Sequence, residues 1–302
     1  MTAAPPVSST GPPSSSAGPP VALTIAGSDS GGGAGLQADL RTFTACGVHG
    51  CVAVTAVTVQ NSMGVMGIVE IPPSTVANQI RAVVTDLGVA AAKTGMLASA
   101  AIICAVAGVC DEISIGRCRV VPLVVDPVAS SMHGDPLLAD DALTVLRSEL
   151  LPRATLITPN LDEVRLLVGM DIGSPAEQYE AARALHALGP RWVLVKGGHL
   201  RDGAQRKNPP KKNPPKKNSQ CVDVLYDGRE FTAFTGPRLA TPHTHGSGDT
   251  LAAAITSALA RGAAVPEAVT YGKRYIAQAL AHAYPLGAGV GPVSPFWRVR
   301  PD

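Results

Sequence analysis

The sequence predicts a three-layer α/β/α protein, in which helices cover both faces of a mainly parallel central sheet. Two observations support this fold class. Five apolar runs are continuous rather than alternating in hydrophobicity, which is typical of strands that are buried on both faces. Segments with the periodicity of helices lie between these runs, and such strand–helix alternation favours a parallel sheet. The predicted strands are 21–27, 50–59, 120–126, 155–158 and 192–196, and the predicted helices are 35–46, 74–87, 98–110, 138–150, 160–168 and 175–188.

The pattern changes after the fifth predicted strand. Residues 221–234 predict a β-hairpin that turns at Asp227-Gly228, a dipeptide favoured in two-residue turns. Two helices close the chain, over 249–261 and 266–284. We therefore expect a single domain over 21–302.

Two segments fall outside this alternation. Residues 1–20 are rich in Pro and Ser and cannot bury an apolar core, so they predict a disordered tail. Residues 204–219 predict a flexible basic loop, because the stretch 207–218 repeats Lys, Asn and Pro every five residues and is too rich in Pro for a helix or a central strand. We expect this loop to be extended and solvated, and a role in docking an anionic partner is the alternative.

Charge and composition exclude several classes of protein. The formal net charge is +2, but six of the 25 basic residues lie in the basic loop, and the rest of the chain has 19 basic and 23 acidic residues. The folded part is therefore mildly acidic and gives no support for nucleic-acid binding. No apolar run reaches the ~18–20 residues of a membrane helix, so no membrane partner is expected.

The six cysteines bear on the compartment. They show no zinc or redox spacing, and no signal-peptide pattern precedes the first strand. Most of them lie in apolar surroundings, where a reduced Cys behaves as a small hydrophobe. We expect buried free thiols in a cytoplasmic protein.

Residues 27–35, Gly-Ser-Asp-Ser-Gly-Gly-Gly-Ala-Gly, form a first glycine-rich segment directly after a predicted strand. A dinucleotide-binding loop of this kind requires an acidic residue at the end of the next strand, whereas that strand ends in Thr-Val-Gln-Asn at 58–61. A P-loop is excluded as well, because the only Gly-Lys pair, Gly272-Lys273, is followed by Arg. Two interpretations remain: a flexible connection, or a loop whose backbone approaches a small ligand closely.

A second glycine-rich segment, Thr-His-Gly-Ser-Gly-Asp-Thr at 244–250, opens a predicted helix. The backbone N–H groups of Gly246, Ser247 and Gly248 can converge on an anion there, helped by the helix dipole. Asp249 follows directly. In the first helical turn its carboxylate would complement the dipole by ~0.3–1 kcal/mol, and a catalytic role fits the spacing equally well.

Further polar residues stand where predicted strands end, which is where ligands bind in open α/β sheets. Asp126 precedes Pro127, so it is either a turn residue or a metal or phosphate ligand. Asn160 and Glu163 have the spacing of a capping box, which would account for both, although ligand groups belong at the same place. Lys196 offers a cation before two glycines.

Seven motifs follow one another along the chain: ALTIAGSDSGGGAGLQADL, VTVQNSMGV, AKTGML, VVDPVASSMHGDPLL, LITPNLDE, VLVKGGH and HGSGDTLA. In this order the sequence resembles the hydroxymethylpyrimidine/phosphomethylpyrimidine kinases of thiamine biosynthesis, which belong to the ribokinase-like superfamily. The resemblance runs from about Val21 to Pro295. GSDSGGGAGLQADL and VQN are specific to this branch, and the glycine–Asp helix start is shared by the whole superfamily.

The resemblance implies an ATP-dependent kinase that phosphorylates 4-amino-5-hydroxymethyl-2-methylpyrimidine and then its monophosphate, giving the diphosphate. It implies ATP and Mg²⁺ as cofactors, and it suggests a homodimer. The same resemblance implies that Gly27, Asp39, Gln60 and Met96 line the pyrimidine pocket and that Asn160 and Lys196 bind ATP. It implies that Asp126 and Glu163 bind the metal. It also implies that Gly246, Ser247 and Gly248 form the anion hole and that Asp249 is the general base.

The chemistry of two of these side chains agrees with a pyrimidine pocket. The Gln60 carboxamide both donates and accepts, which matches the adjacent amino group and ring nitrogen of an aminopyrimidine. The Met96 thioether makes polarisable contact with a ring. The plainer alternatives are a polar turn residue for Gln60, a solvated helix face for Asp39 and core packing for Met96.

Two features depart from the family pattern. Many members have Cys at the position of Asp249, whereas this chain has Asp there, as ribokinase and adenosine kinase do. The second departure is the basic repeat 207–218, which is an insertion relative to the family pattern. A kinase of the same fold that acts on pyridoxal or a related B6 vitamer is therefore one alternative. A non-catalytic pyrimidine-binding or regulatory protein is another, and the joint presence of the glycines, Asp249 and Glu163 argues against it.

Overall fold

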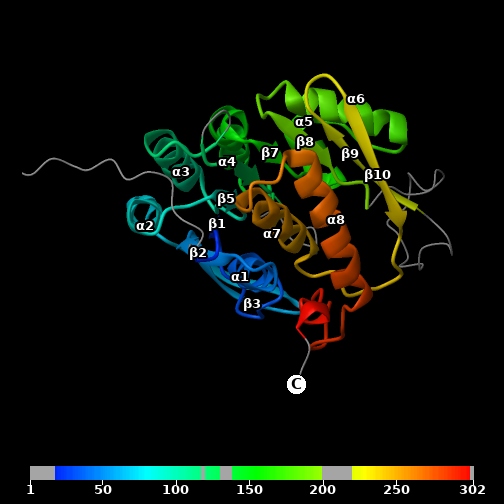
Figure 1. Ribbon diagram of the computed structural model, residues 1–302, viewed down its shortest axis with the longest axis horizontal. Helices are drawn as coiled ribbons and strands as arrows, with labels where there is room; N and C mark the ends of the chain where they lie inside the picture. Colours follow the sequence, from blue (N-terminus) through cyan, green and yellow to red (C-terminus); the bar gives the residue numbers. More distant parts are fainter. Residues whose placement is uncertain (1–17, 117–119, 130–137, 199–219, 300–302) are drawn as a thin grey trace, which may run out of the picture.

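The computed structural model describes residues 18–116, 120–129, 138–198 and 220–299, and its centre is a mainly parallel sheet (Figure 1). The strand order is β10-β9-β8-β7-β6-β5-β1-β2. The strands are β1 (Val21–Ala26), β2 (His49–Val54), β5 (Ala91–Thr94), β6 (Leu123–Val125), β7 (Leu156–Ile157), β8 (Trp192–Val195), β9 (Gln220–Tyr226) and β10 (Phe231–Pro237). Only β9 and β10 run antiparallel to their neighbours, and they form the predicted hairpin at one edge.

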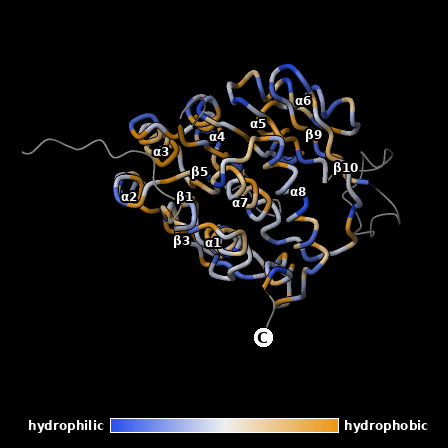
Figure 2. The backbone as a smooth tube through the Cα atoms, viewed as in Figure 1, coloured by the Kyte–Doolittle hydropathy of each residue, from blue (hydrophilic) through white to orange (hydrophobic). Residues whose placement is uncertain are grey.

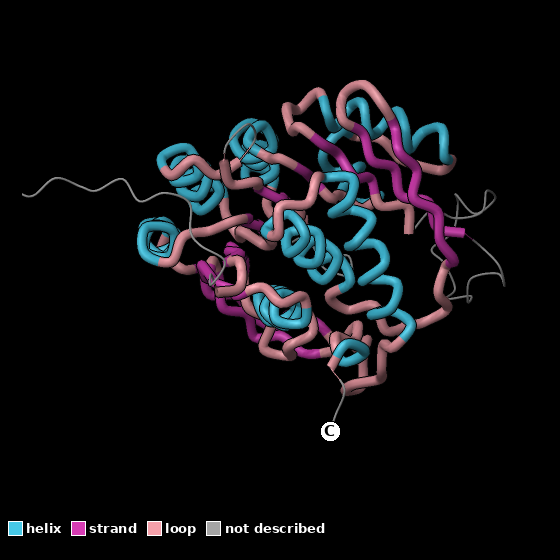
Figure 3. Tube along the Cα trace, viewed as in Figure 1, coloured by secondary structure: helices cyan, strands magenta, loops and turns pink. Residues whose placement is uncertain are grey.

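Helices cover both faces of the sheet, so the predicted three-layer architecture is confirmed. One face carries α1 (Gly35–Ala45), α7 (Ser247–Ala260) and α8 (Val265–Ala281). The other carries α2 (Pro73–Asp86), α3 (Ala100–Glu112), α4 (Asp140–Val145), α5 (Leu161–Val168) and α6 (Pro175–His186). Three short helical turns complete the described chain: η1 (Leu146–Leu150), η2 (Leu151–Arg153) and η3 (Phe296–Arg298). Figure 3 shows how strands and helices alternate along the chain.

Two hydrophobic cores explain why the strand sequences are apolar without alternation. Along β1, Leu23 and Ile25 face the core under α2 and α3, whereas Ala22 faces the core under α1 and α7. Both faces of each central strand are therefore buried, as is usual in parallel sheets. Figure 2 shows hydrophobic colour along α7, in the interior of the molecule.

The single strand predicted over 50–59 is wrong, because the chain forms two strands there. β2 ends at Val54, and β3 (Ala56–Asn61) instead pairs antiparallel with β4 (Gly64–Glu70) in a separate two-stranded sheet. Thr55 makes the break: its N–H donates to Ala26 O at 3.0 Å and its hydroxyl to Met96 O at 2.6 Å, so the chain is tied at the end of β1 and redirected. Apolar residues on both sides of Thr55 hid this change of sheet.

Some predictions concern residues outside the described ranges. The basic loop 204–219 lies there entirely, as does all of the predicted tail except 18–20. Within the described chain, no helix is long and apolar enough to cross a membrane. The five described cysteines are free thiols, three of them buried, Cys221 half-buried and Cys104 exposed.

Candidate active site

The parallel strands bring their carboxyl ends to one edge of the sheet, and the predicted site residues follow these ends. Gly27 comes after β1, Met96 after β5 and Asp126 after β6, while Asn160 and Lys196 follow β7 and β8 and form a bridge with each other. The helix α7 packs on β1, β5 and β6, so its first turn reaches the same edge. The order of the strands in the sheet and the packing of α7 on it thus bring together residues that are far apart in the sequence.

The second glycine-rich segment forms the start of α7. Gly246 has φ 73°, a left-handed conformation suited to glycine, and a Cβ atom there would collide with the carbonyl oxygen of Gly33. The Ser247 N–H donates to Thr244 O at 3.1 Å. The N–H groups of Gly248 and Asp249 belong to the first helical turn and therefore have no intrahelical acceptor. Of the predicted anion hole (Gly246, Ser247 and Gly248), the Gly248 amide is therefore open to a ligand, and the Asp249 amide, which was not predicted, lies beside it; these two amides are called the cradle below.

Asp249 lies between this cradle and a buried lysine. Its side chain is 15% exposed, and Oδ1 lies 3.4 Å from Nζ of Lys93, whose side chain is fully buried. A Cβ atom at Gly95 would lie 3.4 Å from Lys93 Nζ and 3.8 Å from Asp249 Oδ1, so the glycine leaves room for this contact. The carboxylate therefore faces the sheet edge with a cation behind it.

Asp39 belongs to the same charged group. Its carboxylate is fully buried, 2.8 Å from Lys93 Nζ, and accepts a hydrogen bond from the Thr24 hydroxyl at 2.6 Å. Burial raises the pKa of Asp39, an effect that the attraction of Lys93 only partly offsets. Burial also acts to lower the pKa of Lys93, but Asp39 and Asp249 outweigh it and the net pKa is raised. The alternative interpretation, that Asp39 lies on a solvated helix face, is wrong. The Asp39 carboxylate is buried and forms an ion pair with Lys93.

A second charged group surrounds Asp126. Its Oδ1 accepts from the Thr158 hydroxyl at 2.9 Å and lies 3.1 Å from Lys196 Nζ. A Cβ atom at Gly248 would lie 3.3 Å from Asp126 Oδ2 and 3.5 Å from Lys196 Nζ. The structure therefore brings Asp126 and Lys196 to the predicted anion hole, and the glycine at 248 leaves room between them.

Asn160 and Glu163 form the predicted capping box at the start of α5. Asn160 Oδ1 accepts from Glu163 N at 2.9 Å, and Glu163 Oε2 accepts from Asn160 N at 2.8 Å. Burial raises the pKa of Glu163 to about 7, against the opposing attraction of Lys196. The capping role is thus real, and it places the Glu163 carboxylate in the electrostatic field of both Lys196 and Asp126.

Three residues that the resemblance assigns to the pyrimidine pocket are Gly27 after β1, Gln60 near the end of β3 and Met96 after β5. Gly27 N donates to Met96 O at 3.1 Å, and a Cβ atom at Gly27 would lie 2.6 Å from the Met96 methyl group. Gln60 stands at the end of β3, half-buried, and its Oε1 is 3.4 Å from the Thr58 hydroxyl. This weak contact leaves most of the hydrogen-bonding capacity of the carboxamide available.

The first glycine-rich segment carries its own anion. The Asp29 carboxylate accepts from the N–H groups of Gly31, Gly33 and Ala34 at 2.8–2.9 Å and lies 2.8 Å from His245 Nε2. Burial opposes ionisation of Asp29, but the hydrogen bonds from His245 and Ala34 outweigh it and the pKa is lowered. Converging amides that could have held a phosphate are therefore occupied by a side chain of the protein itself.

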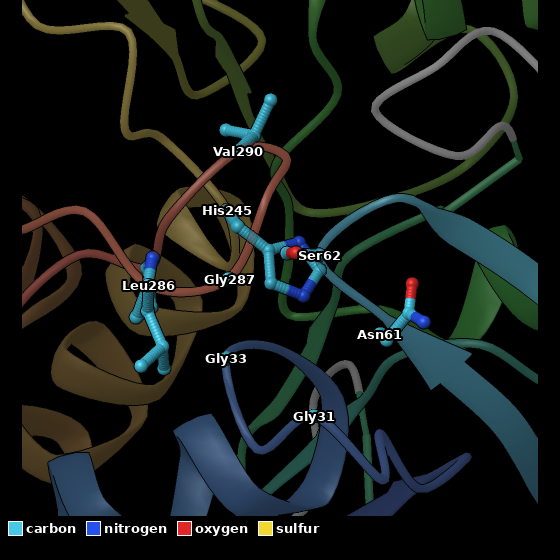
Figure 4. A pocket seen from close by; sticks show the side chains of 9 residues that line it. Gly31, Gly33, Asn61, Ser62, His245, Leu286, Gly287 and Val290 are labelled. Atoms are coloured by element: carbon cyan, nitrogen blue, oxygen red, sulfur yellow. The ribbon is translucent and has the colours of Figure 1, made fainter.

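Three residues of this region were missed by the sequence predictions: Lys93, Asp29 and His245. A signal existed for Lys93, because it is the one charged residue in the buried strand Ala-Ala-Lys-Thr, and a buried lysine requires partners. Asp29 and His245 are 216 residues apart and meet only in the fold. A cavity of about 260 Å³ beside His245 is shown in Figure 4. It is lined by Gly31, Gly33, Asn61, Ser62, His245, Leu286, Gly287, Val290 and Pro292.

Comparison with known proteins agrees with the resemblance. A family model described as phosphomethylpyrimidine kinase matches residues 29–294. The hydroxymethylpyrimidine/phosphomethylpyrimidine kinase of Mycobacterium tuberculosis is 57% identical over 279 residues, which is 92% of this chain and 94% of that protein. The enzyme of the same name from Streptomyces coelicolor is 49% identical over 91% of this chain and 94% of its own length.

Solved structures show the same fold. The phosphomethylpyrimidine kinase of Clostridium difficile superposes with a TM-score of 0.71 at 36% identity, covering 86% of this chain and 99% of that one. The pyridoxal kinase of Staphylococcus aureus in complex with AMP-PCP and pyridoxal superposes with a TM-score of 0.78 at 31% identity, covering 92% and 94%. With charged strand ends, a glycine-rich helix start and this degree of identity, the chain belongs to the phosphomethylpyrimidine kinase family and has the ribokinase-like fold.

Proposed function

We propose that the protein transfers the γ-phosphoryl group of ATP to the hydroxyl of 4-amino-5-hydroxymethyl-2-methylpyrimidine and then to the resulting monophosphate, in thiamine diphosphate biosynthesis. One observation carries the proposal: Asp249, 15% exposed, lies in the first turn of α7 beside the open amides and close to Gly95, the residue after β5. A nucleophile held there would meet both a carboxylate and a cradle for the phosphoryl group.

The acceptor pocket is assigned to Gly27, Gln60 and Met96. The absence of a side chain at Gly27 makes room for the Met96 methyl group, which can pack on a pyrimidine ring. The Gln60 carboxamide can pair with the amino group and ring nitrogen of the substrate. Asp39 contributes through Lys93 in this proposal, because its carboxylate is fully buried.

The transfer step needs little covalent chemistry from the protein. Phosphoryl transfer depends mainly on alignment and on stabilising charge on the equatorial oxygens. The Gly248 and Asp249 amides supply that stabilisation, with the α7 dipole behind them. Asp249 accepts the proton of the hydroxymethyl group as the oxygen attacks phosphorus.

ATP and Mg²⁺ are assigned to the side of Asp126. Within the described ranges, no group of three or more His, Cys, Asp or Glu side chains is gathered to hold a metal. Mg²⁺ in kinases is commonly held by one or two carboxylates together with phosphate oxygens and water, and the donor set fits that case. Asp126 and Glu163 would hold the ion, and Asp126 Oδ2 faces Gly248 and thus the cradle. When bound, the ion neutralises charge on the transferred phosphate. Lys196 and Asn160 complete the proposed nucleotide side.

A homodimer in the cytoplasm completes the proposal. Val57, Val59 and Val69 lie on one face of the β3–β4 ribbon and are 47%, 54% and 64% exposed, with Met66 nearby at 66%. A two-stranded ribbon is marginally stable on its own, and a contiguous apolar face of this kind is typical of an interface. A second copy of the chain would cover it. ATP as the donor and free cysteines fit a reducing cytoplasm.

An ATP-coupled assay with the hydroxymethylpyrimidine, its monophosphate and pyridoxal as competing substrates tests the proposal. We expect turnover of both pyrimidines with kcat/KM values well above that for pyridoxal. Pyridoxal is included because solved pyridoxal kinases share the fold at 31–37% identity. A higher kcat/KM for pyridoxal, or no turnover of either pyrimidine, would overturn the assignment.

A further inference from the structure

We propose that Asp29, through His245, is a positioning residue for phosphoryl transfer: the pair fastens the acceptor-side glycine loop (residues 27–35) to the glycine-rich start of α7. The inference rests on the proposed function and concerns how the acceptor pocket and the cradle for the phosphoryl group are held in place relative to each other. It assigns a role to two residues that stand outside the acceptor pocket, the anion hole and the nucleotide side.

Asp29 determines the conformation of the acceptor-side loop. Its Oδ1 accepts from Gly31 N at 2.8 Å, and its Oδ2 accepts from Gly33 N at 2.9 Å and Ala34 N at 2.8 Å. The carboxylate is 2% exposed, and losing these bonds would leave three backbone amides, of which that of Gly33 is buried, without these acceptors. One side chain thereby orders the whole turn between β1 and α1.

His245 connects the Asp29 carboxylate to the glycine-rich start of α7. Its Nε2 lies 2.8 Å from Asp29 Oδ2, and the ring is 11% exposed. Its backbone is fixed on both sides, because His245 N donates to Gly291 O at 3.1 Å and His245 O accepts from Val293 N at 3.1 Å. The ring is therefore presented from an anchored segment, directly before Gly246.

The two loops also touch without intervening side chains. A Cβ atom at Gly33 would collide with the His245 ring, and one at Gly246 would collide with the Gly33 carbonyl oxygen. Each contact requires glycine at one of its ends. The loops thus meet at two adjacent points, with the Asp29–His245 pair as their polar link.

A cavity borders the His245 ring on the side open to solvent. About 260 Å³ of space lies on the open side of the ring, bordered by Asn61, Ser62 and the segment 286–292 (Figure 4). Packing is open on that side of the ring, and the hydrogen bond to Asp29 is one of the contacts that fix its orientation. Without it, the ring has room to turn away from Gly33.

The consequence concerns alignment. Gly27, on the acceptor side, lies two residues before Asp29, and the amides of the cradle lie three and four residues after His245. A displacement of about 1 Å between reacting groups can cost roughly 10²-fold in rate. Breaking the link should therefore lower kcat with both pyrimidine substrates, while ATP, held on the side of Asp126, binds as before.

The test compares His245→Leu, His245→Gln and Asp29→Asn in the full-length protein. His245→Leu and Asp29→Asn remove the charged hydrogen bond, and we expect kcat to fall by about 10- to 100-fold with each pyrimidine. The dissociation constant of ADP, measured by calorimetry, should change by less than about twofold, since ADP has no γ-phosphoryl group to place on the cradle and its binding does not use the link. His245→Gln keeps an N–H donor for Asp29 and should recover most of the lost kcat. His282→Leu, at an exposed histidine after α8, is the matched control.

A kcat near the wild-type value in His245→Leu would overturn the inference, as would equal losses in the Leu and Gln variants. If His245→Leu does not fold, the cycle of Asp29→Asn, His245→Ala and their combination decides, because linked residues give non-additive losses of kcat and independent residues give additive ones. Additive losses would overturn the inference. A wild-type protein inactive on both pyrimidines would instead overturn the proposed function.

Discussion

The ammonium nitrogen of Lys93 lies 3.4 Å from a carboxylate oxygen of Asp249, and its other partner, Asp39, is fully buried. Asp249, which is assigned as the general base, thus contacts the buried ammonium group of Lys93, and the charge of Lys93 is also balanced by the carboxylate of Asp39. Lys93 holds the two acids at a fixed spacing and keeps the charge of the group low. This arrangement determines what removal of each member should do.

Replacing Lys93 by Met should destabilise the protein by about 3–5 kcal/mol at neutral pH, because a fully buried carboxylate then loses its ammonium partner. Urea denaturation followed by circular dichroism measures the change. The double variant Lys93→Met/Asp39→Asn removes both charges and should recover a large part of the loss. A double variant as unstable as the single one would show that Asp39 is not the residue that depends on Lys93.

Replacing Gln60 by Ala should raise the KM for the hydroxymethylpyrimidine and leave the KM for ATP unchanged. Loss of a hydrogen-bonding partner for a buried polar group costs about 1–3 kcal/mol, and steady-state kinetics with each substrate varied in turn measures it. Asn61→Ala, one residue further along β3 with its side chain exposed, is the matched control. An unchanged KM for the pyrimidine in Gln60→Ala would remove Gln60 from the pocket.

The sequence predicted the central sheet, the helices on it and the polar residues at its edge because these depend on local patterns. Continuous apolar runs mark doubly buried strands, and the capping box of Asn160 and Glu163 is a short-range signal. The break at Thr55 was missed because it depends on bonds to Ala26 and Met96, which are distant in sequence. Contacts between distant residues have no local signature.

The same reasoning applies to the candidate site. Most predicted residues lie at the carboxyl ends of the strands, where the fold class alone places ligands. Asp39 differs, since only the structure reveals that Lys93 occupies its carboxylate. The side chain was foreseen, but its partner was not.

The pH dependence of stability should reveal the ionised state of Asp29. Its pKa is lowered from 3.8 in the folded protein, so the carboxylate contributes stability that is present above pH 3.8 and is lost as the pH falls through the lower, folded-state pKa. Asp29→Asn should therefore unfold at lower urea concentration than wild type at pH 7, and the gap should narrow below about pH 3.8. A gap of constant size from pH 7 to pH 3 would show that charge on Asp29 contributes nothing.

If a second copy of the chain covers the exposed apolar face of β3 and β4, a charge introduced on that face should prevent dimerisation. Val59→Asp places a carboxylate in the centre of the apolar face and should convert the proposed dimer to a monomer, because burying an unpaired charge at an interface is costly. Sedimentation equilibrium measures the mass. Leu87→Asp, at an equally exposed residue after α2, is the control. A wild-type monomer, or a Val59→Asp dimer, would contradict the proposal.

The two phosphorylations should depend differently on Asp249. The hydroxymethyl group must lose its proton as it attacks the γ-phosphorus, and general base catalysis typically contributes ~10²–10⁴-fold to such a step. The second nucleophile is a phosphate monoester, which is already ionised at neutral pH. A base is of little use to it, and the negative charge of Asp249 opposes its approach.

Asp249→Asn should therefore slow the first phosphorylation far more than the second, although the loose transition state of phosphoryl transfer keeps the contribution of the base toward the lower end of that range. The fold should tolerate the change, because Lys93 keeps Asp39 at 2.8 Å. Single-turnover rates with each purified substrate at saturating Mg-ATP measure the effect, and the ratio of the two rates cancels any loss of folded protein. Equal losses in both steps would mean that Asp249 acts through geometry, the metal or the phosphate charge, and the assignment of a general base would fall.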